Sequence, residues 1–224
     1  MAGPVLAFER GMYVQELWRY PVKSMAGEIL KRAAIGPDGI WGDRVLQVRD
    51  ARGRIVTSRS RPALLSHCGT LAPDGEPLVD GRSWKSPEVG REIEAAAGPG
   101  AGLVRSEGLE RFDILPLLVA TEGGVRAFGY DHRRLRPNLL IGGVTGLAER
   151  QWEGCRLQLG KVLLGLVDLR ERCVMTTFDP DTQVQDVDVL RKIRREFGGK
   201  LALNARVLEG GTVAVGDEVE ILRP

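Results

Sequence analysis

The sequence has few of the residues from which metal centres and hydrolase sites are usually built. It contains three cysteines and two histidines in 224 residues, and it has no Cys-x-x-Cys pair. A zinc site or a histidine-dependent hydrolase would need more of these residues. Three scattered cysteines do not suit a disulfide framework either, so each is expected to be a free thiol. If the chain is an enzyme, its difficult chemistry is expected to come from a bound cofactor.

The chain also lacks long apolar runs and an excess of charge of one sign. No apolar stretch approaches the ~20 residues of a membrane helix, and residues 1–11 lack the basic-then-apolar order of a secretory signal. Lys and Arg number 32 and Asp and Glu 30, a formal net charge of +2. This balance favours neither nucleic acid nor a membrane as a partner, so any anion site must be local. These features predict a soluble cytoplasmic protein.

What is present is a chain long enough for a sizeable core, divided into short segments by 29 glycines and 12 prolines. This spacing favours many strands. Residues 12–18 are rich in β-formers, and residues 40–49 and 54–58 flank the turn sequence Asp-Ala-Arg-Gly and predict a hairpin. Further strands are predicted at residues 63–71, 102–106, 115–120, 138–141, 156–159, 161–169, 201–208 and 217–222. The predicted fold class is mainly β, or α+β.

Helical periodicity with matching caps occurs in two segments. Residues 86–98 begin with Ser-Pro, an N-cap followed by proline at the first helical position, and end at glycine. Residues 186–198 carry apolar side chains on one stripe and basic ones on the other, and also end at glycine. A third helix, of two turns at most, is predicted near Thr121 because Gly123 and Gly124 interrupt it.

The best candidate domain boundary is the segment 95–102, which is small, glycine-rich and short of large apolar residues. It divides the chain into residues 1–95 and 96–224. Clefts between two packed units are common ligand sites.

The segment with the most chemical content is Arg172-Cys173-Val174-Met175-Thr176-Thr177-Phe178-Asp179-Pro180-Asp181-Thr182. Hydroxyls and backbone amides can converge there beside a thiol that follows an arginine. One interpretation is a thiolate that binds a metal. The other is a small buried hydrophobic residue, as most free cysteines are, and spacing alone favours it.

Several separated motifs together resemble a known family. The Cys173 segment resembles the cofactor-cysteine motif of the MOSC family, the molybdenum-cofactor sulfurase C-terminal domains. Residues 18–24, Trp-Arg-Tyr-Pro-Val-Lys-Ser, are similar to the opening signature of the β-barrel domain that precedes MOSC in the mitochondrial amidoxime-reducing component and its bacterial relatives. Matches in the same order are Gly42-Asp43-Arg44, Arg136-Pro137-Asn138-Leu139 and Val215-Gly216-Asp217-Glu218-Val219. The resemblance implies an N-terminal β-barrel-like domain, residues 1–95, packed against a MOSC β-barrel domain, residues 96–224, with a few short helices.

The resemblance also implies a cofactor site. In the family the cysteine, here Cys173, is a thiolate ligand of the molybdenum held by a phosphorylated pyranopterin, and a soft thiolate suits such a metal. The residues that match cofactor-binding positions are Lys23, Ser24, Arg44, Thr121, Glu122, Arg136, Asn138, Arg172, Thr176 and Asn204. Lysine and arginine suit the phosphate as a point charge and a planar fork. Pro137 is expected to hold Arg136 in an extended conformation.

The implied function is an oxidoreductase that reduces N-hydroxylated or N-oxygenated small molecules to amines by two-electron removal of oxygen. No cysteine follows Cys173 and no glycine-rich nucleotide fingerprint is evident, so a separate reductase is expected to donate the electrons. An alternative is a carrier of molybdenum cofactor or sulfur with no reductase activity of its own. A structural β protein that has lost the metal is a third possibility.

Overall fold

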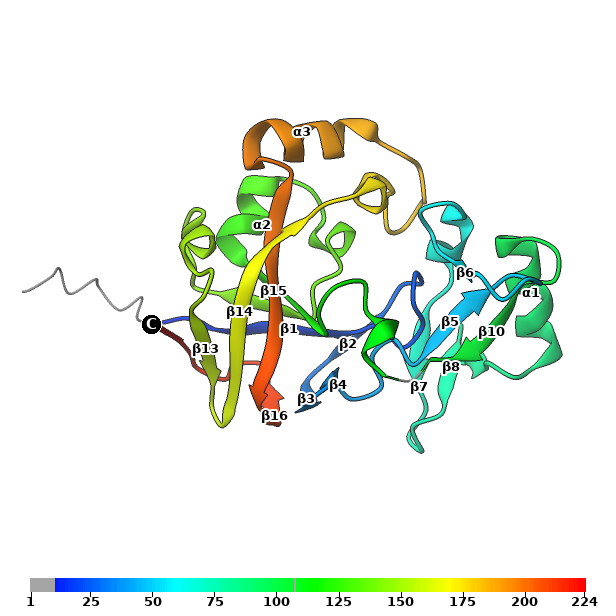
Figure 1. Cartoon of the computed structure of the whole chain (residues 1–224), viewed down its shortest axis with the longest axis horizontal. Coiled ribbons are helices and arrows are strands. Elements are labelled where there is room, and N and C mark those ends of the chain that lie inside the picture. Colours follow the sequence, from blue (N-terminus) through cyan, green and yellow to red (C-terminus); the bar gives the residue numbers. More distant parts are fainter. Residues whose placement is uncertain (1–10, 107) are drawn as a thin grey trace, which may run out of the picture.

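The computed structural model describes residues 11–106 and 108–224, and its main feature is one large mixed sheet (Figure 1). The eight strands lie in the order β17-β13-β14-β15-β11-β12-β1-β2. Strands β11 and β12 run parallel and their other neighbours antiparallel. The strands are β1 (Tyr13–Arg19), β2 (Glu28–Leu30), β11 (Leu117–Thr121), β12 (Leu139–Gly142), β13 (Arg156–Leu159), β14 (Val162–Glu171), β15 (Lys200–Glu209) and β17 (Val219–Leu222).

Three smaller sheets complete the β structure, in the orders β10-β5-β6, β16-β3-β4 and β7-β8-β9. Their strands are β3 (Arg32–Gly36), β4 (Gly39–Ile40), β5 (Leu46–Arg49), β6 (Ile55–Val56), β7 (Gly69–Leu71), β8 (Pro77–Val79), β9 (Arg82–Ser83), β10 (Gly102–Arg105) and β16 (Gly211–Ala214). The sheet of β5, β6 and β10 lies with α1 (Pro87–Ala97) at the opposite end of the molecule from β13 and β14 (Figure 1). Strands dominate the described chain, so the predicted fold class is confirmed.

The capping residues place the helices as expected. The Ser86 side chain accepts a hydrogen bond from the Val89 amide and begins α1, and Gly98 follows its last residue. Helix α3 (Val187–Phe197) begins at the Asp186 cap and ends at a left-handed Gly198. These predictions are confirmed. Among the described residues, no helix is both long and apolar enough to cross a membrane.

Helix α2 (Glu122–Phe128) has the short length predicted, but it runs through both glycines. A Cβ atom added to Gly123 would lie 2.2 Å from the carbonyl oxygen of Gly146. The predicted interruption is thus wrong, because α2 includes both glycines. Gly123 lets its backbone pack directly against the loop that contains Gly146.

Part of the strand prediction is wrong. Residues 63–71 contain the 3-10 helix Pro62–Ser66, and only Gly69–Leu71 form a strand. Proline suits the first turn of a helix because it has no amide hydrogen to lose there, and Leu64 then packs into the core. Strands β2, β3, β8, β9 and β16 were not expected. β2, β8 and β9 have only two or three residues and so show no clear alternation, and in β3 the exposed Ala34 between buried Ala33 and Ile35 hides it.

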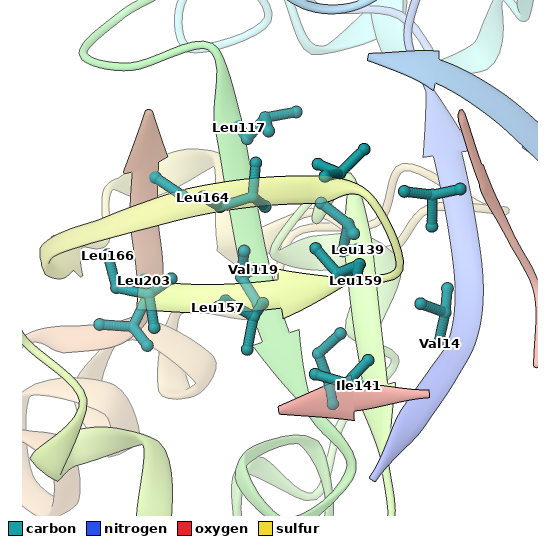
Figure 2. Close-up of a cluster of buried hydrophobic side chains, with 14 of the residues drawn as sticks. Val14, Leu117, Val119, Leu139, Ile141, Leu157, Leu159, Leu164, Leu166 and Leu203 are labelled. Carbon is teal, nitrogen blue, oxygen red and sulfur yellow. The ribbon is translucent and has the colours of Figure 1, made fainter. Parts of the chain in front are cut away.

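The two largest of the four hydrophobic clusters among the described residues support these sheets. The larger one packs against the large sheet and includes Val14 of β1 together with residues of β11 to β15 (Figure 2). The smaller one packs α1 against β5, through residues such as Val48 and Ile93. The turn that follows β1 leads from the larger core to the smaller one, where Val22 and Met25 are buried. Because β1 pairs with β12 and Val14 joins the larger core, segments on either side of residue 95 share one sheet. A domain boundary at that residue stays a prediction.

Candidate functional site

A cavity of about 380 Å³ collects most of the predicted site residues. Its walls come from the turn after β1, the loops before β5 and after β6, the loops that lead into β11 and β12, and the end of β14. The predicted residues that line it are Lys23, Ser24, Arg44, Arg136, Asn138, Arg172, Cys173 and Asn204. Residues up to 181 positions apart in the sequence thus share one cavity, which we call the cationic cavity.

The other predicted residues do not line this cavity. Thr121 caps α2 and donates a hydrogen bond from Oγ1 to Glu149 at 3.0 Å. Glu122 forms an ion pair along α2. The Thr176 hydroxyl donates to the carbonyl oxygen of Cys173 at 2.8 Å. Of these three residues, Thr176 is the one that contacts Cys173, and it does so at the backbone carbonyl of the cysteine.

Cys173 lies just beyond β14 and caps the 3-10 helix Val174–Thr177. The preceding residue, Arg172, is held next to the start of β15, because its amide donates to the carbonyl of Gly199, the residue before that strand, at 2.9 Å. All three cysteines are free thiols. Cys155 is buried in the larger core, whereas the thiol of Cys173 is partly exposed in the cationic cavity.

Cations dominate the lining of the cavity. They are Lys23, Arg44, Arg59, Arg134, Arg136, Arg170 and Arg172, and the carboxylates beside them are Asp113 and Glu171. Sequence reasoning missed Arg59, Arg170 and Asp113. Arg170 lies two residues before Arg172 at the end of β14, so the alternation of side chains along the strand could have indicated that both face the cavity. Arg59 and Asp113 lie in loops and have no such signal.

Two arginines of the cavity, Arg136 and Arg172, are partly buried and lack an ion-pair partner among the described residues. Burial lowers the pKa of both Arg136 and Arg172 to about 10. Arg172 donates to the Leu135 carbonyl at 2.7 Å, while its Nε atom is buried and has no hydrogen-bond partner. Neither arginine forms an ion pair with a described residue. Because an uncompensated buried cation is costly, the cavity favours an anionic ligand.

Tyr20 and Asp43 organise the arginines from the two halves of the chain. The guanidinium carbons of Arg136 and Arg44 lie 4.2 and 5.4 Å from the centre of the Tyr20 ring. Asp43, fully buried, pairs with Arg44 and accepts from the Tyr20 amide at 2.7 Å. It also accepts from the Asn138 side-chain amide at 3.2 Å. The Asn138 amide is thus already used within the protein, although the residue lines the cavity.

The backbone of the cavity is strained at several positions. Ser24, Arg44 and Arg136 have φ angles of 72°, 53° and 58°, values that favour glycine. Such residues cost roughly 1–3 kcal/mol each and cluster at functional sites. The expectation that Pro137 holds Arg136 extended is wrong. The Arg136 amide donates to the Arg133 carbonyl at 3.1 Å and closes a turn, and Arg136 itself adopts the left-handed conformation.

One carboxylate ties several cations together. Asp113 lies 2.8 Å from Lys23, 2.7 Å from Arg59 and 3.6 Å from Arg170. Burial acts to raise the pKa of Asp113, but these cations outweigh it and hold the pKa below its ordinary value. Asp113 therefore stays ionised and keeps the three cations together at one side of the cavity.

A second group of possible metal ligands lies elsewhere. His67, Asp80 and Glu92 have ligand atoms within 4.8 Å of one another. Glu92 is engaged by a bidentate ion pair with Arg82, and His67 contacts Asp80 at 2.7 Å. These groups already satisfy one another as a surface ion-pair cluster.

The chain is similar in sequence to known domains and proteins. The chain matches the MOSC N-terminal beta barrel domain over residues 11–80 and the MOSC domain over residues 119–220. It is 26% identical to mitochondrial amidoxime-reducing component 1 of Homo sapiens, over 93% of this chain and 82% of that protein. It is also 26% identical to mitochondrial amidoxime reducing component 2 of Homo sapiens, over 81% of this chain and 72% of the relative.

A solved structure supports the fold alone. The YUAD protein from Bacillus subtilis superposes with a TM-score of 0.50 at 13% identity, covering 97% of this chain and all of that one. Together with the two domain matches, this likeness extends over nearly the whole chain. The chain thus contains, in this order, a segment that matches the MOSC N-terminal beta barrel domain and a segment that matches the MOSC domain.

Proposed function

We propose that the protein is a molybdenum-cofactor-dependent oxidoreductase that reduces N-hydroxylated small molecules to amines. The observation that carries the proposal is the position of Cys173 in one cavity with Lys23, Arg44 and Arg136. A thiol and cations from distant segments are the groups that a metal bound to an anionic organic chelate requires. The names of the relatives support amidoximes as one class of substrate.

The residues of the cavity fit the cofactor. Cys173 would ligate molybdenum, and Lys23 and Arg44 would bind the phosphate of the pyranopterin. The unpartnered Nε of Arg172 and the unpaired charge of Arg136 provide further sites for an anion. When bound, the molybdenum cofactor supplies a centre that exchanges two electrons with the substrate.

The reaction must balance electrons and protons. Breaking the N–O bond and forming N–H and water consumes two electrons and two protons. Asp113 is a poor proton donor because its pKa is held low, so its role is to position Lys23, Arg59 and Arg170. The protons are therefore expected from water, and the electrons from a separate reductase.

The cytoplasmic localisation stays a prediction, and the relatives are mitochondrial by name.

The test combines metal analysis with turnover. Purified wild-type protein, reduced with dithionite, should contain molybdenum and convert benzamidoxime to benzamidine. Cys173→Ala should lose both properties, whereas Cys155→Ala removes a thiol from the hydrophobic core and should keep both.

The outcomes separate the candidate functions. A Cys173→Ala protein that retains molybdenum and turnover would contradict the proposal. Molybdenum in the wild type without reduction of any N-hydroxylated compound would favour a cofactor or sulfur carrier. Absence of molybdenum would favour a structural protein.

A further inference from the structure

A second cavity, of about 260 Å³, adjoins the cationic cavity. The two share Arg134, Arg136 and Met175 as wall residues. The second cavity is also lined by Trp18, Tyr20, Gly27, Leu65, Arg133 and Asp181. We call it the aromatic cavity. It is larger than the roughly 150 Å³ apolar cavity that holds one benzene molecule in an engineered protein.

Two nearly parallel aromatic rings line the aromatic cavity. The rings of Trp18 and Tyr20 are stacked with centroids 6.4 Å apart and an interplanar angle of 17°. The Trp18 indole is fixed by a hydrogen bond that its Nε1 donates to Glu16 at 2.6 Å. A Cβ atom added to Gly27 would lie 2.5 Å from the Tyr20 ring, so glycine is needed at that position. A preformed wall of this kind suits a planar ring.

Two of the three arginines that line the aromatic cavity, Arg133 and Arg134, are engaged in ion pairs. Arg134 donates from Nη1 to the Thr177 carbonyl at 3.0 Å and from Nη2 to the Asp179 carboxylate at 2.9 Å. Its third nitrogen, Nε, is buried and has no hydrogen-bond partner among the described residues. Arg133 forms a bidentate pair with Asp181 at 2.9 and 2.7 Å. A pterin needs many hydrogen-bond partners along its edge, and this lining offers few. An apolar aromatic ring needs none.

The position of the aromatic cavity links it to Cys173. Met175, two residues after the cysteine, lines both cavities. Methionine side chains are flexible and adapt to different neighbours. A ligand that places a ring in the aromatic cavity can therefore reach past Met175 with its polar end into the cationic cavity.

We propose that the aromatic cavity binds the ring of an aryl N-hydroxylated substrate, such as an aryl amidoxime, whose N–OH group lies in the cationic cavity. This inference rests on the proposed function. It assigns Trp18, Tyr20 and Leu65 to substrate specificity. Aryl substrates should therefore bind more tightly than alkyl substrates with the same N–OH group.

The test compares benzamidoxime with acetamidoxime. Their dissociation constants are measured on the full-length holoprotein without reductant, by ligand-observed NMR titration. Benzamidoxime should bind about tenfold or more tightly than acetamidoxime, because its ring is removed from water. Leu65→Trp fills the aromatic cavity and should bring the ratio of the two constants close to one. Leu208→Trp, the same substitution at an exposed site outside both cavities, should keep the wild-type ratio.

Three results would overturn the inference: a wild-type ratio near one, an unchanged ratio in Leu65→Trp, or loss of molybdenum in that variant. The last would mean that the aromatic cavity holds part of the cofactor. If Leu65→Trp does not fold, Trp18→Leu, which removes the flat indole, should lower the ratio about threefold or more.

A separate measurement distinguishes failure of the proposed function. Wild-type protein reduced with dithionite should convert acetamidoxime to acetamidine, whatever the aromatic cavity binds. A protein that prefers benzamidoxime but reduces neither compound contradicts the proposed function and not the ring site. A protein that reduces both but shows no preference contradicts only the ring site.

Discussion

Replacing Asp113 by asparagine tests whether one carboxylate holds the cations of the cavity together. The substitution keeps the size of the side chain and removes its charge, leaving Lys23 and Arg59 without their partner at 2.8 and 2.7 Å. The Asp113 side chain is 33% exposed, so each short pair is weakened by solvent and contributes roughly 0.5–1 kcal/mol. Asp113→Asn should therefore lower the free energy of unfolding by about 1–2 kcal/mol at pH 7.

The pH dependence of this loss has a definite sign. Burial opposes the shift, but Lys23, Arg59 and Arg170 hold the pKa of folded Asp113 below its unfolded value of 3.8. A depressed pKa stabilises the fold above the unfolded pKa, and this contribution is lost as the pH falls through the folded pKa. The difference between wild type and Asp113→Asn should thus be constant above about pH 5 and shrink below about pH 4.

Urea unfolding at several pH values, in low and in roughly 1 M salt, measures both effects. Asp38→Asn is the matched control, because its carboxylate is more exposed and lies 4.0 Å from Arg111. It should change the stability by less than about 0.5 kcal/mol. The reasoning would be refuted if Asp113→Asn were as stable as the wild type in low salt, or if the loss did not shrink in acid.

Two further predictions concern the backbone and the ring that support the cavities. Gly123→Ala should destabilise the protein by about 1–3 kcal/mol in urea unfolding, because its Cβ would meet the Gly146 carbonyl at 2.2 Å. Gly90→Ala in α1 meets no atom within 4 Å and should instead be neutral or stabilising by up to about 1 kcal/mol, so equal effects at both glycines would contradict the close-packing argument. Tyr20→Phe should cost about 1 kcal/mol by removing one buried hydrogen bond, whereas Tyr20→Leu should also lose the ring beside Arg136 and reduce the molybdenum content. Unfolding and metal analysis check this pair, and full metal content in Tyr20→Leu would show that the ring does not position the arginines.

Local signals in the sequence predicted the elements that depend on neighbouring residues. The serine cap and proline of residues 86–98 and the stripe of residues 186–198 placed α1 and α3, because capping and helical periodicity act within a few residues. The Asp-Ala-Arg-Gly turn placed the β5–β6 hairpin for the same reason. The family resemblance added Cys173 and most of the residues that share its cavity.

The sequence predicted less well where distant contacts decide the local structure. The apolar pattern of residues 63–71 suits a strand, yet the packing of Leu64 in the smaller core goes with a 3-10 helix. The pair Gly123 and Gly124 weakens a helix by propensity, and only the tertiary contact with the loop at Gly146 shows why glycine is needed at position 123.

By itself, the sequence determined the β-rich class and the capped helices, because each depends on a short motif or on residue periodicity, whereas Cys173 was singled out by the family resemblance. Only the tertiary structure decided that Arg59, Arg170 and Asp113 join the cavity and that Thr121 and Glu122 do not line it. It also brought Trp18 and Leu65 to one aromatic cavity beside the first. The physical reason is that these side chains come from segments far apart along the chain, and their meeting depends on how the sheets pack rather than on any local pattern.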